Sequence, residues 1–276
     1  MSNPLVSVEE LAAELASDHR VVLADVRWTL NGPPGRPEYE QGHLPGAVWV
    51  DLESELTTHG PSGGRHPLPD PDTFQRAMRR IGVSADVPVV VYDGATSLAA
   101  SRLWWLLTDA GHPSVRVLDG GFTGWRAAGQ PVETGAGPTP TPGDFVVAPG
   151  HRRAVGASEV AALRGTEVAL IDVRAADRYA GENETIDPVA GHIPGALSRP
   201  STANLTASGA FRPAAEIAER FADVPGEPVL YCGSGITAAH TLLALESTGR
   251  RGMIYPGSWS DWITDPDRPR ATGPTP

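Results

Sequence analysis

The sequence predicts an α/β fold built as two tandem domains, and two observations carry this prediction: an internal repeat and an alternation of strand and helix patterns. Four motifs occur twice in the same order, about 140 residues apart. A repeat of that length has the size of a domain and is far longer than a solenoid unit. The four pairs are residues 23–27 with 170–174, 42–47 with 191–196, 91–94 with 230–233, and 120–125 with 257–262.

Strand and helix signals alternate within each copy. Ser7 predicts a helix start, because its side chain can cap the helix and Glu10 completes a capping box. Short apolar runs predict buried strands, and the longer runs that follow them end in helix-terminating Gly111 and Gly249. This alternation implies a mainly parallel sheet flanked by helices on both faces in each domain. The predicted strands are 21–25, 87–92, 115–118, 168–171, 228–231 and 252–254, and the predicted helices are 7–17, 72–81, 97–110, 214–221 and 237–248.

The boundary between the domains is predicted from composition. Residues 129–150 are rich in Gly and Pro and contain few apolar side chains, as is typical of a stiffened linker. We therefore expect an N-terminal domain over 1–130, a linker over 131–150 and a C-terminal domain over 151–276.

The charged residues exclude several classes of protein. The chain has 276 residues with 22 basic and 33 acidic side chains, a net charge of −11, and every basic residue is Arg. Without Lys, neither a pyridoxal phosphate Schiff base nor a P-loop can form. An acidic chain with no long Arg cluster also argues against a nucleic-acid partner. No apolar run is long enough for a membrane helix and the amino terminus does not read as a secretory signal, so we expect a cytoplasmic protein with no membrane partner.

The single cysteine, Cys232, follows a predicted strand and precedes a predicted helix. Ligands of open parallel sheets bind at such strand ends. The backbone amides of the next five residues can point inward, and the helix amino terminus favours the thiolate over the thiol. The loop therefore predicts a reactive thiolate, in preference to an inert buried cysteine. The expected amide donors are Gly233, Ser234, Gly235, Ile236 and Thr237, and the Thr237 hydroxyl is also a candidate helix cap.

Other interpretations of this loop are weaker. Residues 233–238 match the dinucleotide pattern G-x-G-x-x-A, but they do not open a βαβ unit. A cysteine phosphatase would need Arg at position 238, where this chain has Ala238. The eight histidines are scattered and only one cysteine is present, so we expect no metal site.

With these motifs together, the sequence resembles the tandem-domain rhodanese and 3-mercaptopyruvate sulfurtransferase family over almost its whole length. The resemblance rests on the D-V-R strand ends, the two G-H-[IL]-P-G-A turns, the C-G-S-G-I-T loop and the closing G-S-W-x-x-W. It implies two rhodanese-like domains, a catalytic Cys232 that becomes a persulfide, and no cofactor. It also implies an inactive N-terminal domain, since Asp93 stands at the position that matches Cys232.

The resemblance further assigns roles to individual residues. Arg178 matches the residue that grips the carboxylate or sulfonate of the donor. The second Arg of related mercaptopyruvate enzymes has no match within 182–189, so another residue such as Arg102 could replace it. Ser234 and His66 match a proposed proton relay, whose acid would be Asp51 or Glu53.

The loop also bears on the donor. Thiosulfate-using members tend to carry Arg or Lys in this loop, whereas Gly233 and Ser234 are neutral, which favours 3-mercaptopyruvate and leaves thiosulfate as the alternative. The expected partners are a small anionic sulfur donor and a thiol acceptor, either a small thiol or a thioredoxin-like protein, with cyanide as a further acceptor. A non-catalytic persulfide carrier and a purely structural protein remain as competing hypotheses.

Overall fold

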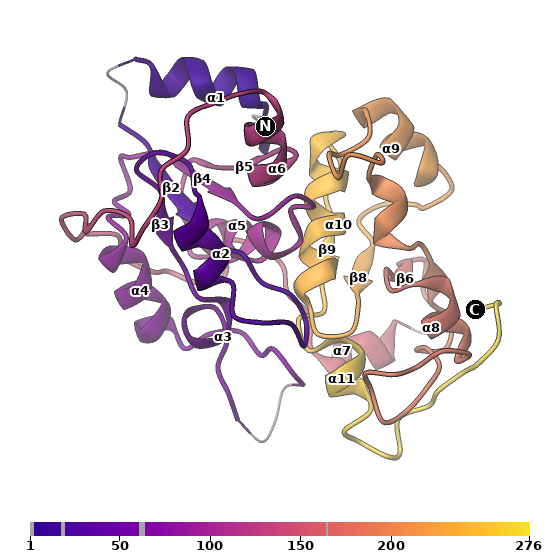
Figure 1. Ribbon diagram of the computed structural model, residues 1–276. Helices are drawn as coiled ribbons and strands as arrows, with labels where there is room; N and C mark the ends of the chain where they lie inside the picture. Colours follow the sequence, from indigo (N-terminus) through magenta and orange to yellow (C-terminus); the bar gives the residue numbers. More distant parts are fainter. Residues whose placement is uncertain (1–2, 18–19, 61–63, 164) are drawn as a thin grey trace. The chain divides into compact units, whose positions relative to one another are not determined.

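The computed structural model describes residues 3–17, 20–60, 64–163 and 165–276, and contacts divide the chain into two compact units (Figure 1). Each unit contains most of one sequence repeat and a short segment from the other half of the chain. Unit 1 comprises Met1–Thr58, Pro69–Arg152 and Thr206–Phe211, and unit 2 comprises His59–Leu68, Arg153–Leu205 and Arg212–Pro276.

Unit 1 is a five-stranded sheet in the order β1-β5-β4-β2-β3, and every strand pair is parallel. Its strands are short and mostly buried, as expected for a sheet covered by helices. The strands are β1 Leu5–Val6, β2 Val22–Asp25, β3 Val48–Trp49, β4 Val89–Tyr92 and β5 Val115–Leu118. The helices are α1 Val8–Leu15, α2 Arg36–Gln41, α3 Leu52–Glu55, α4 Pro71–Arg80, α5 Leu98–Asp109 and α6 Gly121–Ala127.

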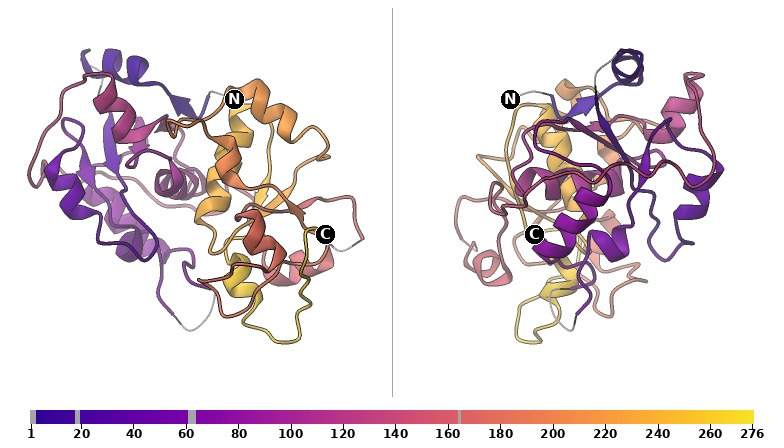
Figure 2. Two further views of the ribbon diagram at one scale, coloured as in Figure 1. Left: turned by 45° about the vertical axis from the view of Figure 1, so that its right-hand side comes forward. Right: turned by 90° about the vertical axis from the view of Figure 1, so that its left-hand side faces the viewer.

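Unit 2 repeats this architecture with four parallel strands in the order β7-β6-β8-β9. Helix α10 contacts β8 and β9, and both views of Figure 2 show it alongside the sheet. The strands are β6 Leu170–Asp172, β7 Leu197–Ser198, β8 Val229–Tyr231 and β9 Met253–Ile254. The helices are α7 Ala157–Ala162, α8 Ala176–Ala180, the 3-10 helix η1 Ser201–Asn204, α9 Ala214–Arg220, α10 Ile236–Ser247 and α11 Ser258–Trp262.

Two predicted helix starts have different outcomes. At α1 the capping box is confirmed: Ser7 Oγ accepts from the Glu10 amide at 3.2 Å, and the Glu10 carboxylate accepts from the Ser7 amide at 2.9 Å. At α10 the expectation that Thr237 caps the helix is wrong. The cap residue is Gly235, because the chain turns there in a left-handed conformation and Thr237 already lies in the first helical turn.

The repeated D-V-R motif ties a strand end to the turn beside it in both units. Arg27 donates to Asp25 at 2.9 Å and to the Gly42 carbonyl at 2.6 Å. Arg174 donates to Asp172 at 2.6 Å and to the Gly191 carbonyl at 2.6 Å. The motif therefore recurs because each G-H-x-P-G-A turn needs a buried guanidinium to hold it against the sheet.

The two repeated histidines also occupy matching places. The ring of His43 stacks on Tyr39 with centroids 4.1 Å apart, and the ring of His192 stacks on Tyr179 at 3.7 Å. In each case the histidine Nδ1 lies within 3 Å of the carbonyl oxygen of that tyrosine, 2.9 Å for His43 and 2.8 Å for His192. Both histidines therefore help to build their turns.

The predicted linker packs on unit 1 along part of its length. The Gly143 amide donates to the Arg79 carbonyl at 2.8 Å, Arg79 Nε donates to the Phe145 carbonyl at 2.8 Å, and Phe145 is buried. By contacts, unit 1 continues to Arg152. Within the described part of the chain, no helix has the length and apolar character needed to cross a membrane.

Candidate active site

The loop between β8 and α10 brings the single thiol to the amino end of a helix. Cys232 Sγ accepts a hydrogen bond from the Gly235 amide at 3.1 Å. The Cys232 amide donates to Ser258 Oγ at 3.1 Å, and that oxygen lies 3.9 Å from Sγ. Gly235 is one of the five amide donors expected for the sulfur, and donation by the other four stays a prediction.

The path of this loop depends on glycine at position 235. Gly235 has φ +86°, and a Cβ there would lie 2.4 Å from the Pro256 carbonyl oxygen. Any side chain would therefore clash with backbone in a conformation that L residues rarely adopt. The Gly235 amide is the group that donates to the sulfur, so this hydrogen bond depends on a turn that only glycine allows.

Cys232 is only 2% exposed, which is less than expected for a nucleophile. Burial alone would fit an inert cysteine, yet the residues beside it are cationic and partly open to solvent. A Cβ on Gly233 would lie 2.6 Å from Arg65 Nη2 and 3.8 Å from both terminal nitrogens of Arg178. The side chains of Arg65 and Arg178 are 26% and 16% exposed. An anion can therefore meet two guanidinium groups next to the thiol.

Two carboxylates hold these guanidinium groups. Arg178 donates to Glu184 at 3.0 Å and to Asp187 at 2.9 Å, and Arg65 also pairs with Asp187. Burial raises the pKa of Asp187 in spite of Arg65 and Arg178. Burial also opposes ionisation of Glu184, but the amides of Asp187 and Ile186 and the charge of Arg178 outweigh it, so the pKa of Glu184 is lowered.

His66 lies beside the loop through Ser234. Its Nδ1 is 2.7 Å from Ser234 Oγ, and both side chains are buried. The neighbouring Arg65 amide donates to Ser260 Oγ at 3.0 Å, so the short segment around His66 is fastened to α11. The structure thus brings His66 to the loop that carries Cys232 and Ser234, although His66 and Ser234 are 168 positions apart in sequence.

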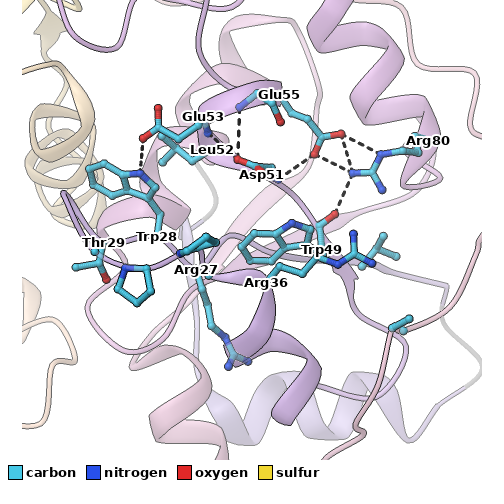
Figure 3. A pocket seen from close by; sticks show the side chains of 18 of the residues that line it. Arg27, Trp28, Thr29, Arg36, Trp49, Asp51, Leu52, Glu53, Glu55 and Arg80 are labelled. Atoms are coloured by element: carbon cyan, nitrogen blue, oxygen red, sulfur yellow. Dashed lines mark hydrogen bonds and ion pairs between the residues drawn. The ribbon is translucent and has the colours of Figure 1, made fainter.

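The acids expected behind His66 have other contacts. The Asp51 carboxylate caps α3 by accepting from the Glu53 amide at 2.9 Å, and the Glu53 carboxylate accepts from Trp28 Nε1 at 2.6 Å. Both line a pocket of about 930 Å³ in unit 1 (Figure 3). Participation of either acid in a relay stays a prediction. Arg102, the residue expected to help bind the sulfur donor in place of the missing second Arg, is buried in α5 of unit 1 and donates to the Leu56 carbonyl at 3.4 Å.

Asp93, at the Cys232 position of unit 1, fills its own loop. The two carboxylate oxygens accept from four backbone amides over distances of 2.9 to 3.4 Å. Unit 1 therefore shows that the main-chain amides of this type of loop bind a carboxyl group, which here is the loop's own side chain. The donors are the amides of Ala95, Ser97, Ala99 and Ala100.

Sequence reasoning missed Arg65, Glu184 and Asp187. Arg65 directly precedes His66, which was a signal that it lies near the site, but nothing in the sequence pairs it with Asp187. Arg65 adds a second cation to the expected Arg178, since its guanidinium lies against Gly233.

Two units with parallel sheets, each with a strand-end loop whose backbone amides donate to a cysteine sulfur or to a carboxyl group, define a tandem protein of the rhodanese type. The chain matches the rhodanese-like domain over residues 7–128 and 156–265, and it belongs to this family.

Its relatives include named sulfurtransferases. It is 43% identical over 283 residues to a probable 3-mercaptopyruvate sulfurtransferase of Pseudomonas aeruginosa, covering 99% of both chains. It is 42% identical over 279 residues to the putative thiosulfate sulfurtransferase SseB of Mycobacterium tuberculosis, covering 98% of this chain and 97% of that one. Among solved structures, the 3-mercaptopyruvate sulfotransferase SseA of Escherichia coli has 33% identity and a TM-score of 0.81, covering 94% of this chain and 100% of that one.

Proposed function

We propose that the protein is a sulfurtransferase that moves sulfur from 3-mercaptopyruvate through a Cys232 persulfide to a thiol or to cyanide. The observation that carries this proposal is the environment of the sulfur. Cys232 Sγ accepts a hydrogen bond from the Gly235 amide at 3.1 Å, and the guanidinium groups of Arg65 and Arg178 lie beside Gly233, the next residue. A thiolate and a persulfide anion need the same amide donors, so one loop can serve both states. The names of its relatives support the same chemistry.

In the first half-reaction, the Cys232 thiolate attacks the sulfur of 3-mercaptopyruvate and forms an S–S bond. The C–S bond breaks and its electron pair goes to the carbon, which gives the enolate of pyruvate. The proton of the donor thiol is delivered to that carbon. We propose that Ser234 with His66 carries it, since Ser234 Oγ lies 2.7 Å from His66 Nδ1. Pyruvate leaves and the persulfide remains, stabilised by the loop.

In the second half-reaction, an acceptor attacks the outer sulfur of the persulfide. The S–S bond breaks and its electron pair returns to Cys232 as a thiolate. The chemistry uses the cysteine alone and requires no cofactor. Small thiols or a thioredoxin-like protein are the acceptors we propose, and these belong to a reducing compartment such as the cytoplasm.

Thiosulfate is the second candidate donor, and the pair Arg65 and Arg178 favours it specifically. Thiosulfate is a dianion, and the two guanidinium groups beside Gly233 offer it charge-assisted hydrogen bonds from both sides of the site. The thiolate would attack the outer sulfur, and sulfite would leave with the electrons of the broken S–S bond. No proton has to reach a carbon in this reaction.

Mass spectrometry of the intact protein tests the proposal. Incubation with 3-mercaptopyruvate should add the mass of one sulfur atom and release pyruvate, and Cys232→Ser should do neither. A Cys232→Ser protein that releases pyruvate at the wild-type rate would refute the assignment. Values of kcat/KM for 3-mercaptopyruvate and thiosulfate, measured side by side, rank the two donors.

Steady-state turnover separates an enzyme from a persulfide carrier. With excess donor and cyanide, an enzyme forms thiocyanate continuously, whereas a carrier that needs a dedicated partner loads once and stalls. We also propose that the N-terminal domain, residues 1–130, is catalytically inactive, because the Asp93 carboxylate occupies the amides that a sulfur anion would need.

A further inference from the structure

We propose that unit 1 contains a second small-molecule site, which binds a zwitterion, namely a free α-amino acid. The juxtaposition that carries this inference is a pocket of about 540 Å³ that is lined by the oppositely charged side chains of Glu38 and Arg126 together with Gly94. The proposed sulfur transfer does not use this pocket, so the inference goes beyond that function and does not depend on it.

The pocket lies at the place where open parallel sheets bind ligands. The chain passes from β2 to β3 on one side and then to β4 on the other side of β2, so the direction of winding changes between β2 and β4. Such a switch point opens a crevice at the carboxyl ends of the two strands. Arg27 follows β2, Gly94 follows β4, and both line the pocket. The corresponding switch point of unit 2 lies between β6 and β8, where the Cys232 loop begins.

The floor of the pocket is open, whereas the equivalent position of unit 2 is covered. The Gly94 carbonyl accepts from the Thr123 amide at 2.9 Å. The Gly233 carbonyl accepts from the Ser260 amide at the same distance, 2.9 Å, so the two glycines are equivalent. A Cβ on Gly233 would lie 2.6 Å from Arg65 Nη2, but a Cβ on Gly94 would meet nothing within 4 Å. Unit 1 therefore keeps free space for a ligand beside its own loop.

The charges of this pocket differ from those of the candidate active site. Tyr39 and Tyr179 occupy equivalent places, since each stacks on the histidine of its turn. The residue before the tyrosine is Glu38 in unit 1 and Arg178 in unit 2. A carboxylate therefore stands where unit 2 has a cation, and Arg126 on α6 supplies the opposite charge. In the part of the chain that the structure describes, no ion pair neutralises Glu38 or Arg126.

These features suit a ligand that carries both charges. Two opposite charges that line one pocket without pairing can each bind a ligand group of the other sign through charge-assisted hydrogen bonds. An α-amino acid offers an ammonium group to Glu38 and a carboxylate to Arg126. A keto acid lacks the ammonium group, so Glu38 opposes its binding. The volume also suits a small metabolite, since ligand pockets typically measure about 300–1,000 Å³.

Nuclear magnetic resonance of the ¹⁵N-labelled protein tests the site, with L-serine as the probe. We expect L-serine to shift the amide signals of Gly94 and Thr123 and to leave that of Gly233 unchanged, which distinguishes this pocket from the Cys232 loop. Propionate lacks the ammonium group and ethylamine lacks the carboxylate. Each should bind about tenfold more weakly than L-serine, because one charged hydrogen bond is lost.

Three variants and a matched control locate the contacts. Glu38→Gln and Arg126→Gln should each raise the Kd for L-serine about tenfold. Gly94→Leu should fold, because open space receives the new side chain, and should abolish binding by filling the pocket. Glu40→Gln on the same helix as Glu38 is the control, since Glu40 pairs with Arg36 and does not line the pocket. It should leave the Kd unchanged.

Several results would overturn the inference. These are equal affinities for L-serine and propionate, shifts confined to Gly233, an unchanged Kd in Glu38→Gln and Arg126→Gln, or no shift with L-serine at concentrations up to about 50 mM. None of these measurements requires turnover. A protein without sulfurtransferase activity would therefore defeat the proposed function and would leave this test of unit 1 intact.

Discussion

Ser234 is the residue that connects the sulfur-bearing loop to a titratable group. Its hydroxyl lies two residues after Cys232 and 2.7 Å from His66 Nδ1. A hydroxyl in that position can pass a proton between the imidazole and a reacting atom, whereas it adds no charge to the donor site. The two candidate donors differ in this requirement, because only 3-mercaptopyruvate needs a proton on carbon.

We therefore expect Ser234→Ala to lower kcat with 3-mercaptopyruvate by about 100-fold and to affect thiosulfate much less. The measurement is steady-state kcat for both donors with cyanide as the acceptor. Persulfide formation from thiosulfate, followed by mass, serves as the control for an intact loop. Equal losses with both donors would show that Ser234 supports the loop and carries no proton.

The raised pKa of Asp25 leads us to expect that the stability of the folded protein depends on pH. Burial raises the pKa of Asp25 from 3.8 to about 6, and Arg27 offsets only part of this effect. Between these two pKa values the native state keeps a proton that the unfolded chain loses. The contribution of Asp25 to the stability of the protein is therefore fully present below about pH 4 and is lost as the pH rises through about 6. A rise in pKa of this size corresponds to a loss of about 3 kcal/mol across that window.

Urea unfolding of the wild type and of Asp25→Asn at several values between pH 4 and pH 7 measures this contribution. The Asn variant should show a flatter dependence of the free energy of unfolding on pH, whatever its absolute stability. Burial also raises the pKa of Asp93 and Asp119, and both groups are present in the two proteins. The comparison therefore isolates the titration of Asp25 together with its electrostatic coupling to Asp93. Parallel curves would contradict the assignment to Asp25.

At the scale of elements, the segment His59–Leu68 decides whether the site is assembled. It carries both Arg65 and His66 and belongs by contacts to unit 2. Gly64 in this segment approaches α11 closely, because a Cβ there would lie 2.5 Å from Ser260 Oγ and 2.8 Å from the Gly257 carbonyl oxygen. Its φ of +82° adds strain for any other residue.

Gly64→Ala should therefore displace the segment and raise KM about tenfold for either donor, with a cost of roughly 1–2 kcal/mol in the folded state. Gly60→Ala is the matched control in the same segment, since a Cβ there meets nothing within 4 Å. Donor saturation curves and thermal unfolding of both variants make the comparison. If the two variants behave alike, the close approach of Gly64 to α11 does not position the site.

The long elements were predictable because their signals are local. Helices α1, α4, α5 and α10 and the strands β2, β4 and β5 lie within a few residues of the predicted ranges, since capping residues, apolar periodicity and helix-ending glycines act over one or two turns. The short elements α2, β3 and α8 were not predicted, because none of them extends over the several turns or the longer apolar run from which a helix or strand can be read. Packing, rather than propensity, determines them.

The same distinction applies to the site. The loop from Cys232 onward could be interpreted from adjacent residues, and the role expected for Arg178 followed from the match of a short local motif to the family. The contact between Arg65 and Asp187 joins residues 122 positions apart. It depends on the segment His59–Leu68, which lies in the first sequence repeat but belongs by contacts to unit 2. No pattern along the chain encodes that pairing, so the second guanidinium required the three-dimensional structure.

At the scale of the whole molecule, the duplication allows the unit that we propose to be reactive to be compared with the one that we propose to be inactive. Tyr39 and Tyr179 occupy equivalent places, because each hydroxyl donates to the carbonyl of the Ala that ends the following turn, at 2.7 Å and 2.6 Å. The residue before each tyrosine is then equivalent, and it is Glu38 in unit 1 and Arg178 in unit 2. Unit 1 therefore differs in two ways: a carboxylate fills its loop, and an acid stands where a donor-binding cation would be.

This double difference predicts that restoring the thiol alone does not restore activity. In a Cys232→Ser background, Asp93→Cys frees the four amides that now bind the carboxylate, but Glu38 repels an anionic donor. We expect sulfur transfer from 3-mercaptopyruvate to stay below about 1% of the wild-type rate, because loss of a charged donor contact alone costs roughly 2–5 kcal/mol. Iodoacetamide labelling of the new cysteine serves as the control for access. Turnover near the wild-type rate would show that the loop suffices, and that sulfur transfer does not depend on the cations around Cys232.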